Sequence, residues 1–244
     1  MEIKKGDLFL LGNHRLMCGD SLVWTNTQKL LDNHKANMIF TDPPYNINYD
    51  PQNHAWKHNC KSKLKNFKDI DFDIIKVLEL INTGICNGAV FLCCGQSQIG
   101  KIHDWCVKTL KKDPRMLIWV KNNMSISRSH FHRRFETIMY FWYEETKLRG
   151  DHSDIEQDVW FIKSRTAFEY LHPTQKPIRL IQRAIELRSD EKDIVLDLFG
   201  GSGSTLMACE NTNRRCFMME LDPHYIEVII KRWEKYTGKE AICV

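Results

Sequence analysis

The chain has 244 residues, of which 43% are hydrophobic and 27% are charged, and its formal net charge at pH 7 is +4. This length and apolar share predict one domain with a sizeable core, and no segment is long and apolar enough to cross a bilayer. Residues 1–7 lack the apolar stretch of a signal peptide, so we expect a cytoplasmic protein. Because the net charge is small, any nucleic-acid partner would have to meet local basic patches.

Cysteine usage indicates a reducing compartment. The nine cysteines include no Cys-x-x-Cys pair, and Cys93 and Cys94 lie inside an apolar run. This pattern favours buried, reduced thiols over a disulfide framework or a zinc site. The ten histidines also lack the spacing of metal ligands, so we expect no metal.

Short apolar runs alternate with helix-compatible stretches, which predicts an α/β fold with a doubly wound, mostly parallel sheet. The segments Asn46–Lys68 and Glu144–Leu171 are irregular and are expected to be functional loops. The seven predicted strands are His14–Gly19, Ala36–Thr41, Ala89–Cys94, Met116–Lys121, Thr137–Tyr143, Ile194–Phe199 and Arg215–Leu221. The predicted helices are Gln28–His34, Asp73–Thr83, Ile99–Leu110, Ile178–Leu187, Ser204–Asn211 and Pro223–Tyr236.

A proline-rich turn follows the second predicted strand. Asp42 offers a carboxylate acceptor, and Pro43 and Pro44 fix φ and remove backbone donors, which leaves their carbonyl oxygens able to accept. Tyr45 offers an aromatic face on which a base can stack. Acceptors beside an aromatic ring suit an exocyclic amino group, and a plain turn at a strand end is the alternative.

A glycine-rich turn follows the sixth predicted strand. Residues Gly200–Thr205 connect that strand to a helix, and the next strand ends in Glu220. Glycines permit a tight turn and close approach of a ligand at the helix amino terminus. An acid about 20 residues beyond the glycines suits two ribose hydroxyls. The loop lacks the lysine of a phosphate-binding P-loop, so the pattern favours a nucleoside site over a simple helix-capping turn.

Two basic runs follow predicted strand ends, where open parallel sheets place their ligands. One spans residues 57–68, and the other spans residues 128–135 and is interleaved with aromatic residues. Each run could instead be a solvated surface face. The candidate phosphate contacts are Lys61, Lys63, Lys65, Arg128, Arg133 and Arg134.

The order of these motifs resembles the β group of amino-methyltransferases, which methylate adenine N6 or cytosine N4 in DNA with S-adenosylmethionine. In that family an Asp-Pro-Pro-Tyr block precedes a Phe-x-Gly-x-Gly block, as Asp42–Tyr45 precedes Phe199–Gly203 here. Three further blocks match: Cys18–Ser21, His172–Pro177 and Glu220–Tyr225. The resemblance spans nearly the whole chain.

The resemblance implies a circularly permuted, Rossmann-like methyltransferase fold with a seven-stranded sheet and a small recognition insert. The strand before the glycines becomes central, with the Glu220 strand and then the Asp20 strand on one side and the Asp42 strand on the other. The last two strands before the insert would form an antiparallel hairpin. The expected parts are residues 1–143 with the catalytic loop, the insert 144–171, and the cofactor-binding part 172–244.

Adenine N6 is a poor nucleophile because its lone pair is delocalised into the ring. Asp42 and the Pro43 carbonyl can each accept one N6 hydrogen, which orients the lone pair toward the methyl donor. Tyr45 would stack on the target base, which must be swung out of the duplex to be reached. Double-stranded DNA is therefore the expected partner.

The resemblance also implies the cofactor contacts. Glu220 would hold the ribose, and Asp20 would accept from the adenine amino group, its alternative being a turn residue after a strand. Thr174 and Lys176 are candidates for the methionine carboxylate, although Lys176 could instead be a surface residue. The floor under the methionine part would be Asp197, Phe199, Gly201 and Gly203. For one reaction to occur, the proline turn and the glycine turn must form opposite walls of a single cleft.

The chain departs from larger members of this family, which carry a sizeable target-recognition insert. Trp160 and Phe161 in the short segment here suit a small apolar anchor better than base reading. Sequence selection would then use the Asn46–Lys68 loop, use a second copy in a homodimer, or be loose. The expected setting is a bacterial or phage cytoplasm, with restriction–modification as the associated process.

Other activities remain open. Cytosine N4 is the nearest alternative, although relatives acting there more often carry serine at the position of Asp42. Methyltransferases for RNA or for protein glutamine tend to carry asparagine there and the unpermuted order of blocks. A non-catalytic DNA-binding subunit is a third class, against which the intact Asp42, Tyr45, Gly201 and Gly203 argue.

Overall fold

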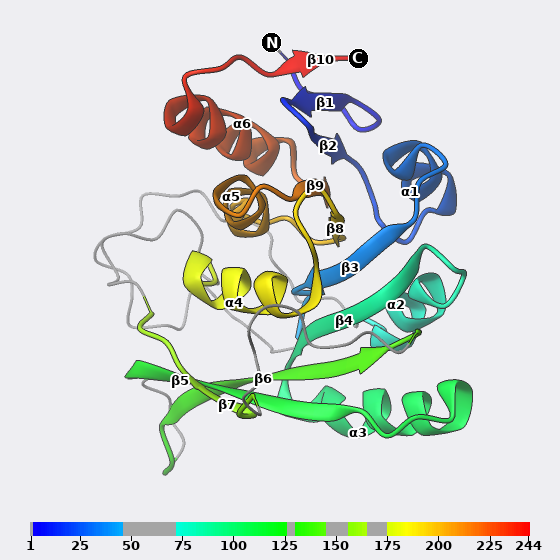
Figure 1. The fold of residues 1–244 in the computed structure, drawn as a ribbon, viewed down its shortest axis with the longest axis vertical. Coiled ribbons are helices and arrows are strands. Elements are labelled where there is room, and N and C mark those ends of the chain that lie inside the picture. Colours follow the sequence, from blue (N-terminus) through cyan, green and yellow to red (C-terminus); the bar gives the residue numbers. More distant parts are fainter. Residues whose placement is uncertain (1, 46–71, 126–129, 145–155, 165–174) are drawn as a thin grey trace.

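The computed structural model describes residues 2–45, 72–125, 130–144, 156–164 and 175–244. Their strands form one ten-stranded sheet in the order β10-β1-β2-β9-β8-β3-β4-β6-β5-β7 (Figure 1). The strands are β1 Leu8–Leu11, β2 His14–Cys18, β3 Ala36–Thr41, β4 Cys86–Cys94, β5 Arg115–Ser125, β6 Arg133–Trp142, β7 Val159–Phe161, β8 Ile194–Asp197, β9 Arg215–Glu220 and β10 Ile242–Cys243.

The helices are α1 Trp24–Leu31, α2 Ile74–Ile81, α3 Gln96–Trp105, the π-helical turn η1 Cys106–Leu110, α4 Ile178–Arg188, α5 Ser204–Asn211 and α6 Pro223–Thr237. The last of these has the clearest sequence signals. The Asp222 carboxylate accepts from the His224 backbone N–H at its start, and Gly238 ends it at φ 72°.

The helices cover both faces of the sheet because the central strands are apolar on both faces. Met38 and Phe40 pack with α4, α5 and α6, whereas Ile39 between them packs with α1, α2 and α3. Figure 1 shows the two groups of helices on opposite sides of the strands. This is the doubly wound arrangement expected from the alternating pattern.

The parallel strands β2, β9, β8, β3 and β4 lie side by side in that order. The carboxyl ends of parallel strands meet at one edge of a sheet, which is where open α/β sheets bind their ligands. The predicted positions of the glycine strand, the Glu220 strand, the Asp20 strand and the Asp42 strand are all confirmed. The antiparallel pairing of β5 with β6 confirms the predicted hairpin.

All seven predicted strands are present, and three short strands that were not predicted extend the sheet to ten. β1 forms a hairpin with β2, and β10 pairs with β1 at the outer edge. β7 lies inside the segment Glu144–Leu171, which was expected to be irregular, and it pairs with β5. Helix α1 begins at Trp24, four residues before the predicted start at Gln28. The three added strands lie toward the two ends of the sheet, away from the central edge.

Within the described residues, no helix has the length and apolar character needed to span a bilayer. The eight cysteines that are described are all unpaired, and seven of them are buried. Among the same residues, no three His, Cys, Asp or Glu side chains gather as a metal-binding group.

Candidate active site

Folding brings the proline turn and the glycine turn together at the carboxyl edge of β3 and β8. Thr41, the last residue of β3, donates its hydroxyl to Asp197 Oδ1 at 3.0 Å. The same hydroxyl oxygen accepts from the Leu198 backbone N–H at 3.1 Å. Residues more than 150 positions apart in the chain are therefore directly hydrogen-bonded. The two turns therefore begin at neighbouring strand ends on one edge of the sheet, and the single cleft expected between them stays a prediction.

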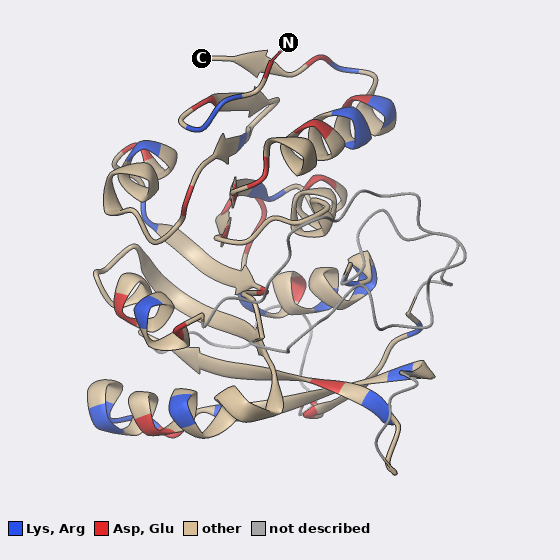
Figure 2. Ribbon diagram, turned by 180° about the vertical axis from the view of Figure 1, so that it is seen from behind, with Lys and Arg blue, Asp and Glu red and all other residues tan. Residues whose placement is uncertain are grey.

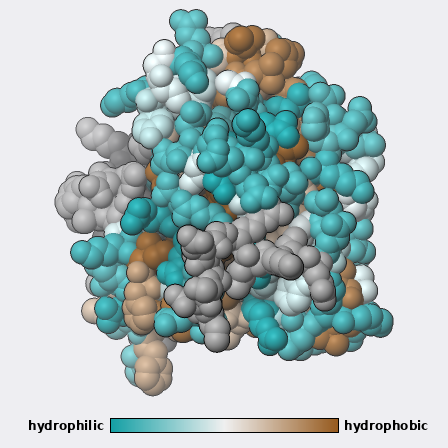
Figure 3. Space-filling view, in the orientation of Figure 1, coloured by the Kyte–Doolittle hydropathy of each residue, from teal (hydrophilic) through white to brown (hydrophobic). Residues whose placement is uncertain are grey.

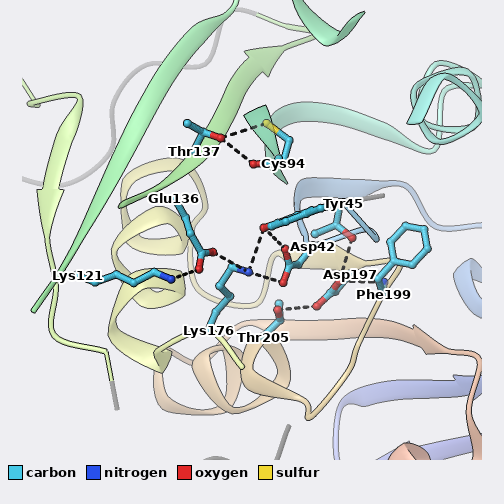
Figure 4. Close-up of polar contacts among 12 residues, drawn as sticks. Asp42, Tyr45, Cys94, Lys121, Glu136, Thr137, Lys176, Asp197, Phe199 and Thr205 are labelled. Atoms are coloured by element: carbon cyan, nitrogen blue, oxygen red, sulfur yellow. Dashed lines mark hydrogen bonds and ion pairs between the residues drawn. The ribbon is translucent and has the colours of Figure 1, made fainter. Parts of the chain in front are cut away.

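The Asp42 carboxylate is held on both oxygens. The Tyr45 hydroxyl donates to Oδ1 at 2.5 Å, and the Lys176 ammonium donates to Oδ2 at 2.5 Å (Figure 4). Gln98 on α3 donates to the Pro44 carbonyl at 3.0 Å, while its own side-chain oxygen accepts from the Gly95 backbone N–H. The proline turn is thus fixed both from within and by the helix beside it.

Lys176 is buried, with 6% of its side chain exposed, and it lies between two carboxylates. Its ammonium is 2.5 Å from Asp42 Oδ2 and 3.1 Å from Glu136 Oε2. Lys121 in turn contacts the other oxygen of Glu136. Figure 4 shows these four charged side chains in a row, with signs that alternate along it. Each buried charge therefore has a counter-ion, as burial requires.

The pKa values of this row follow from those neighbours. Burial lowers the pKa of Lys176, but Asp42 and Glu136 outweigh it and hold that pKa above its ordinary value. Burial raises the pKa of Glu136, but Lys176 and Lys121 outweigh it and hold that pKa below its ordinary value. Both groups are consequently ionised at neutral pH. Burial, and then the charge of Asp42, raises the pKa of Tyr45, which keeps its hydroxyl protonated as a donor.

The ammonium of Lys176 occupies the position that the sequence assigns to a base amine. It donates to Asp42, and it lies 5.2 Å from the centroid of the Tyr45 ring. It also donates to the Tyr45 hydroxyl at 3.1 Å. The alternative of Lys176 as a surface residue was wrong. A base amine that approaches this carboxylate must therefore share it with the lysine or displace the lysine.

The glycine turn forms a cradle at the amino terminus of α5. Gly201 and Gly203 have φ values of +51° and +78°, where a side chain would be strained. A Cβ at Gly203 would also lie 3.0 Å from the side chain of Ile229. Ser204 Oγ is buried and has no hydrogen-bond partner among the described residues. An orphaned hydroxyl in the first turn of a helix fits a polar ligand such as the amino-acid part of S-adenosylmethionine.

Glu220 ends β9 beside this cradle. Its Oε2 accepts from the Gly201 backbone N–H at 2.7 Å, and its Oε1 accepts from the Asp222 backbone N–H at 2.9 Å. Burial raises the pKa of Glu220 above its ordinary value. Each carboxylate oxygen can accept a second hydrogen bond, so two ribose hydroxyls remain compatible with this arrangement.

Asp20 follows β2 at the same edge and is exposed. Its Oδ1 accepts from the Leu22 backbone N–H at 2.9 Å, which is the geometry of a turn residue. Phe199 is partly buried and makes an edge-to-face contact with Phe72 at 5.5 Å between ring centroids. Its backbone N–H donates to Asp197 Oδ1. The site residues predicted from the glycine side therefore share one edge of the sheet.

Asp197 is buried beneath both turns and accepts from the hydroxyls of Thr205 and Thr41 at 2.6 and 3.0 Å. Burial raises its pKa from 3.8 to about 7 despite those hydrogen bonds. Between pH 4 and pH 7 the folded chain therefore keeps a proton on Asp197, whereas the unfolded chain has already released it. The fold is therefore most stable, as far as Asp197 is concerned, below pH 4, and this part of the free energy of unfolding is lost as the pH rises through 7.

We therefore expect Asp197→Asn to become more stable relative to the native chain as the pH rises. An amide at this position resembles the protonated acid and does not titrate. The difference in free energy of unfolding should shift by roughly 3 kcal/mol in favour of the variant between pH 4 and pH 8. Urea unfolding at both pH values measures this difference. A difference that does not change with pH would show that Asp197 ionises normally.

Two of the predicted phosphate contacts, Arg133 and Arg134, lie at the start of β6. Arg133 lines a small cavity together with Tyr45, Gly95 and Phe135. Arg134 is exposed and donates to the Lys121 carbonyl at 3.0 Å. The ribbon in Figure 2 carries the blue of Lys and Arg on this part of the β5–β6 hairpin. The other predicted contacts lie outside the described residues, as does the cofactor candidate Thr174: they are Lys61, Lys63, Lys65 and Arg128.

The two aromatic residues of the short segment behave differently. Trp160 is buried on β7 and donates to the Gln157 carbonyl at 2.8 Å, so it is the apolar anchor that was expected. Phe161 is 77% exposed and is no anchor. Met124 and Phe131 on the β5–β6 hairpin are also exposed. Figure 3 shows hydrophobic colour over this corner of an otherwise mostly hydrophilic face.

Sequence reasoning missed several residues of the site, among them Glu136, Gln98, Ser204 and Lys121, which pairs with Glu136. Glu136 gave a usable signal, since it is a lone acid at the start of the apolar run 137–143. Gln98 gave none, because its role depends on the Pro44 carbonyl 54 positions away. Ser204 was read only as part of the glycine turn, and its buried, unpartnered hydroxyl was not foreseen.

The comparisons with known proteins all find DNA methyltransferases. A family model described as DNA methylase matches residues 36–232. The type II methyltransferase M2.DpnII of Streptococcus pneumoniae is 27% identical, with 87% of this chain and 89% of that protein covered. The DNA adenine methyltransferase YhdJ of Escherichia coli is 24% identical, with 84% and 79% covered.

Solved structures with this fold include a bound cofactor. The crystal structure of the M1.HpyAVI–SAM complex is 25% identical, with a TM-score of 0.64, and covers 89% of this chain and 98% of that one. The cytosine-N4-specific PvuII DNA methyltransferase has a TM-score of 0.67 at 17% identity, which is a likeness of fold alone.

Proposed function

The chain belongs to the DNA methylase family, and we propose that it transfers a methyl group from S-adenosylmethionine to N6 of adenine in double-stranded DNA. The observation that carries this proposal is the direct hydrogen bonding between the turn that bears Asp42 and the strand that leads into the glycine cradle. A methyl donor and an amine acceptor held at these two turns would face each other at one edge of the sheet.

Asp42 has the chemistry that an amine substrate needs. Its carboxylate can accept an N6 hydrogen, and its negative charge stabilises the positive charge that develops on nitrogen as the methyl group arrives. The Pro43 carbonyl is the second acceptor in this proposal. Tyr45 holds Asp42 through its hydroxyl while its ring offers a stacking face. The product amine loses its proton readily once it is alkylated, so no strong base is required.

The cofactor supplies an electrophilic methyl group on a sulfonium when it is bound. The residues that would hold it are those of the glycine cradle and its neighbours. Glu220 is proposed for the ribose and Asp20 for the adenine amino group. Ser204 joins Thr174 as a candidate for the amino-acid end, whereas the ammonium of Lys176, the other residue considered for it, lies between Asp42 and Glu136. The floor of this site would be Asp197, Phe199, Gly201 and Gly203.

Adenine N6 is stacked and paired within a duplex, so the base must be swung out before it can reach Asp42. The basic hairpin beside the Tyr45 cavity is the proposed contact to the DNA backbone. A second copy of the chain in a homodimer would supply recognition surface that the short segment 144–171 lacks. Type II modification in a bacterial cytoplasm is the setting we propose.

Replacing Arg133 and Arg134 by glutamine should weaken DNA binding and flatten its dependence on salt. For each arginine that touches a phosphate, its removal is expected to reduce the slope of log affinity against log salt by roughly one unit. Fluorescence anisotropy of a labelled duplex across a salt series measures that slope. Arg215 on β9, which donates to the Lys192 carbonyl, is a matched control position. An unaltered slope in the double variant would exclude this patch from the DNA interface.

The proposal is tested by identifying the methylated nucleosides in DNA that the chain has treated. Unmethylated DNA is incubated with the purified chain and S-adenosylmethionine that carries a deuterated methyl group, then digested and measured by mass spectrometry. Labelled N6-methyladenine is the expected product. Labelled N4-methylcytosine would support the alternative within the same family, and the absence of both would overturn the proposal.

A further inference from the structure

The ammonium of Lys176 is shared between two carboxylates that are not equivalent. Asp42 Oδ2 accepts a hydrogen bond from it at 2.5 Å. Glu136 Oε2 lies 3.1 Å from the same nitrogen as an ion pair, a longer contact than the one to Asp42. Glu136 therefore keeps unused capacity to accept from the ammonium, which carries three donors.

The reaction creates a competition at Asp42. Its Oδ1 already accepts from the Tyr45 hydroxyl, and its Oδ2 accepts from Lys176. A base amine that donates to Oδ2 shares that oxygen with the lysine, and the second donor weakens the lysine's hydrogen bond to it. A buried ammonium left without a counter-ion is strongly unfavourable. Lys176 can release Asp42 only if another anion remains within its reach.

Glu136 is fixed in a position from which it can serve as that second anion. It lies on β6 opposite Trp119 of β5, and Lys121, two residues further along β5, contacts its Oε1. Its Oε2 is thereby directed toward Lys176, as Figure 4 shows. The carboxylate is thus anchored by one lysine and presented to the other.

We propose that Glu136 is a positioning residue that retains Lys176 when the target amine takes the lysine's place on Asp42. This inference rests on the proposed function. Glu136 acts through Lys176 and does not touch the base. The exchange is a shift of hydrogen bonds: the ammonium strengthens its contact with Glu136 as the amine donates to Asp42. No proton is transferred between these residues.

Glu136→Gln tests the inference by its effect on each kinetic constant. Without the charge of Glu136, Lys176 has Asp42 as its one remaining anionic partner among the described residues, so the amine competes against a tighter ion pair. The expected result is a fall in kcat of at least tenfold, with the KM for DNA and the affinity for DNA without cofactor each changed less than threefold. Glu136→Asp keeps the charge and is expected to recover part of kcat.

A double variant separates positioning from a purely structural role. Once Lys176 is replaced by methionine, Glu136 has nothing to retain, so Glu136→Gln with Lys176→Met should be as fast as Lys176→Met alone. The same equality is expected for Glu136→Asp with Lys176→Met, which serves if the glutamine variant fails to fold. If the reduction in kcat of the double variant equals the product of the reductions in the two single variants, the inference is overturned.

Glu227→Gln is the matched control, since Glu227 pairs with Lys231 at 2.5 Å on the exposed face of α6. It should leave kcat unchanged. If the native chain methylates adenine but Glu136→Gln keeps its full kcat, this inference fails and the proposed function stands. If the native chain methylates no adenine, the proposed function fails and this inference with it.

Discussion

Asp42→Asn is expected to lower kcat for methyl transfer about 1,000-fold and to change the dissociation constant of the cofactor less than threefold. The amide keeps the size of the side chain and one acceptor oxygen. It loses the negative charge that stabilises positive charge on the reacting nitrogen. Lys176 keeps Glu136 as a counter-ion in this variant, so the site should stay folded. Isothermal titration with cofactor and single-turnover methylation provide the two measurements.

A control carboxylate on α3 separates chemistry from general damage. Asp104 is exposed and pairs with Lys108 at 3.6 Å, so Asp104→Asn should affect neither quantity. An equal loss of cofactor affinity and of kcat in Asp42→Asn would show that the aspartate is structural. A kcat within tenfold of the native value would remove Asp42 from the chemistry.

Lys176→Met is expected to have the largest effect on stability, about 3–5 kcal/mol at pH 8. The substitution leaves the carboxylates of Asp42 and Glu136 buried with one cation fewer between them. The deficit should shrink as the pH falls. Lys176 and Lys121 hold the pKa of Glu136 below 4.5 in the native chain, against the effect of burial. Without Lys176 the pKa of Glu136 rises, so the folded variant takes up protons that the native fold does not.

Urea unfolding at pH 8 and pH 5 measures this deficit. Lys231→Met on α6 is the control, because that lysine is exposed and pairs with Glu227. It should change the free energy of unfolding by less than about 0.5 kcal/mol at either pH. A Lys176→Met deficit no larger than that of the control would show that the ion pairs of Lys176 contribute nothing net to the fold.

Two kinds of feature could be predicted from the sequence: the strands, from their local apolar pattern, and the shared edge at which the turns after neighbouring strands lie. The runs 36–41 and 194–197 are apolar on both faces, which predicts adjacent parallel strands. Once those strands are parallel neighbours, the turns after them must share an edge. The contact of Thr41 with Asp197 follows from that geometry. The remaining order of strands in the sheet came from the resemblance to the permuted methyltransferase family, which the order of the motif blocks carries.

The short strands escaped prediction for different reasons. β1 and β2 are joined by Gly12 and Asn13, a two-residue turn with Gly12 at φ +60°, and this hairpin signal could have been read. β7 and β10 have three and two residues, too few for a period to emerge. Their pairing depends on strands far away in the chain.

The charged row around Lys176 could not be derived from sequence. Lys176 lies in a polar block, and nothing in that block distinguishes a buried lysine from an exposed one. Its partners Asp42 and Glu136 are 134 and 40 positions away. The segment that leads into α4 places Lys176 against Asp42, just after β3, and against Glu136, near the start of β6. Burial of the lysine is therefore a product of tertiary structure.

A crystal structure of the chain with sinefungin tests the central claim most directly, because this cofactor analogue carries an amine in place of the transferable methyl. The account predicts that its ribose contacts Glu220, that its adenosine and amino-acid parts lie along the glycine cradle, and that its amine faces Asp42 and Tyr45. An analogue bound with that amine directed away from the proline turn would contradict the account.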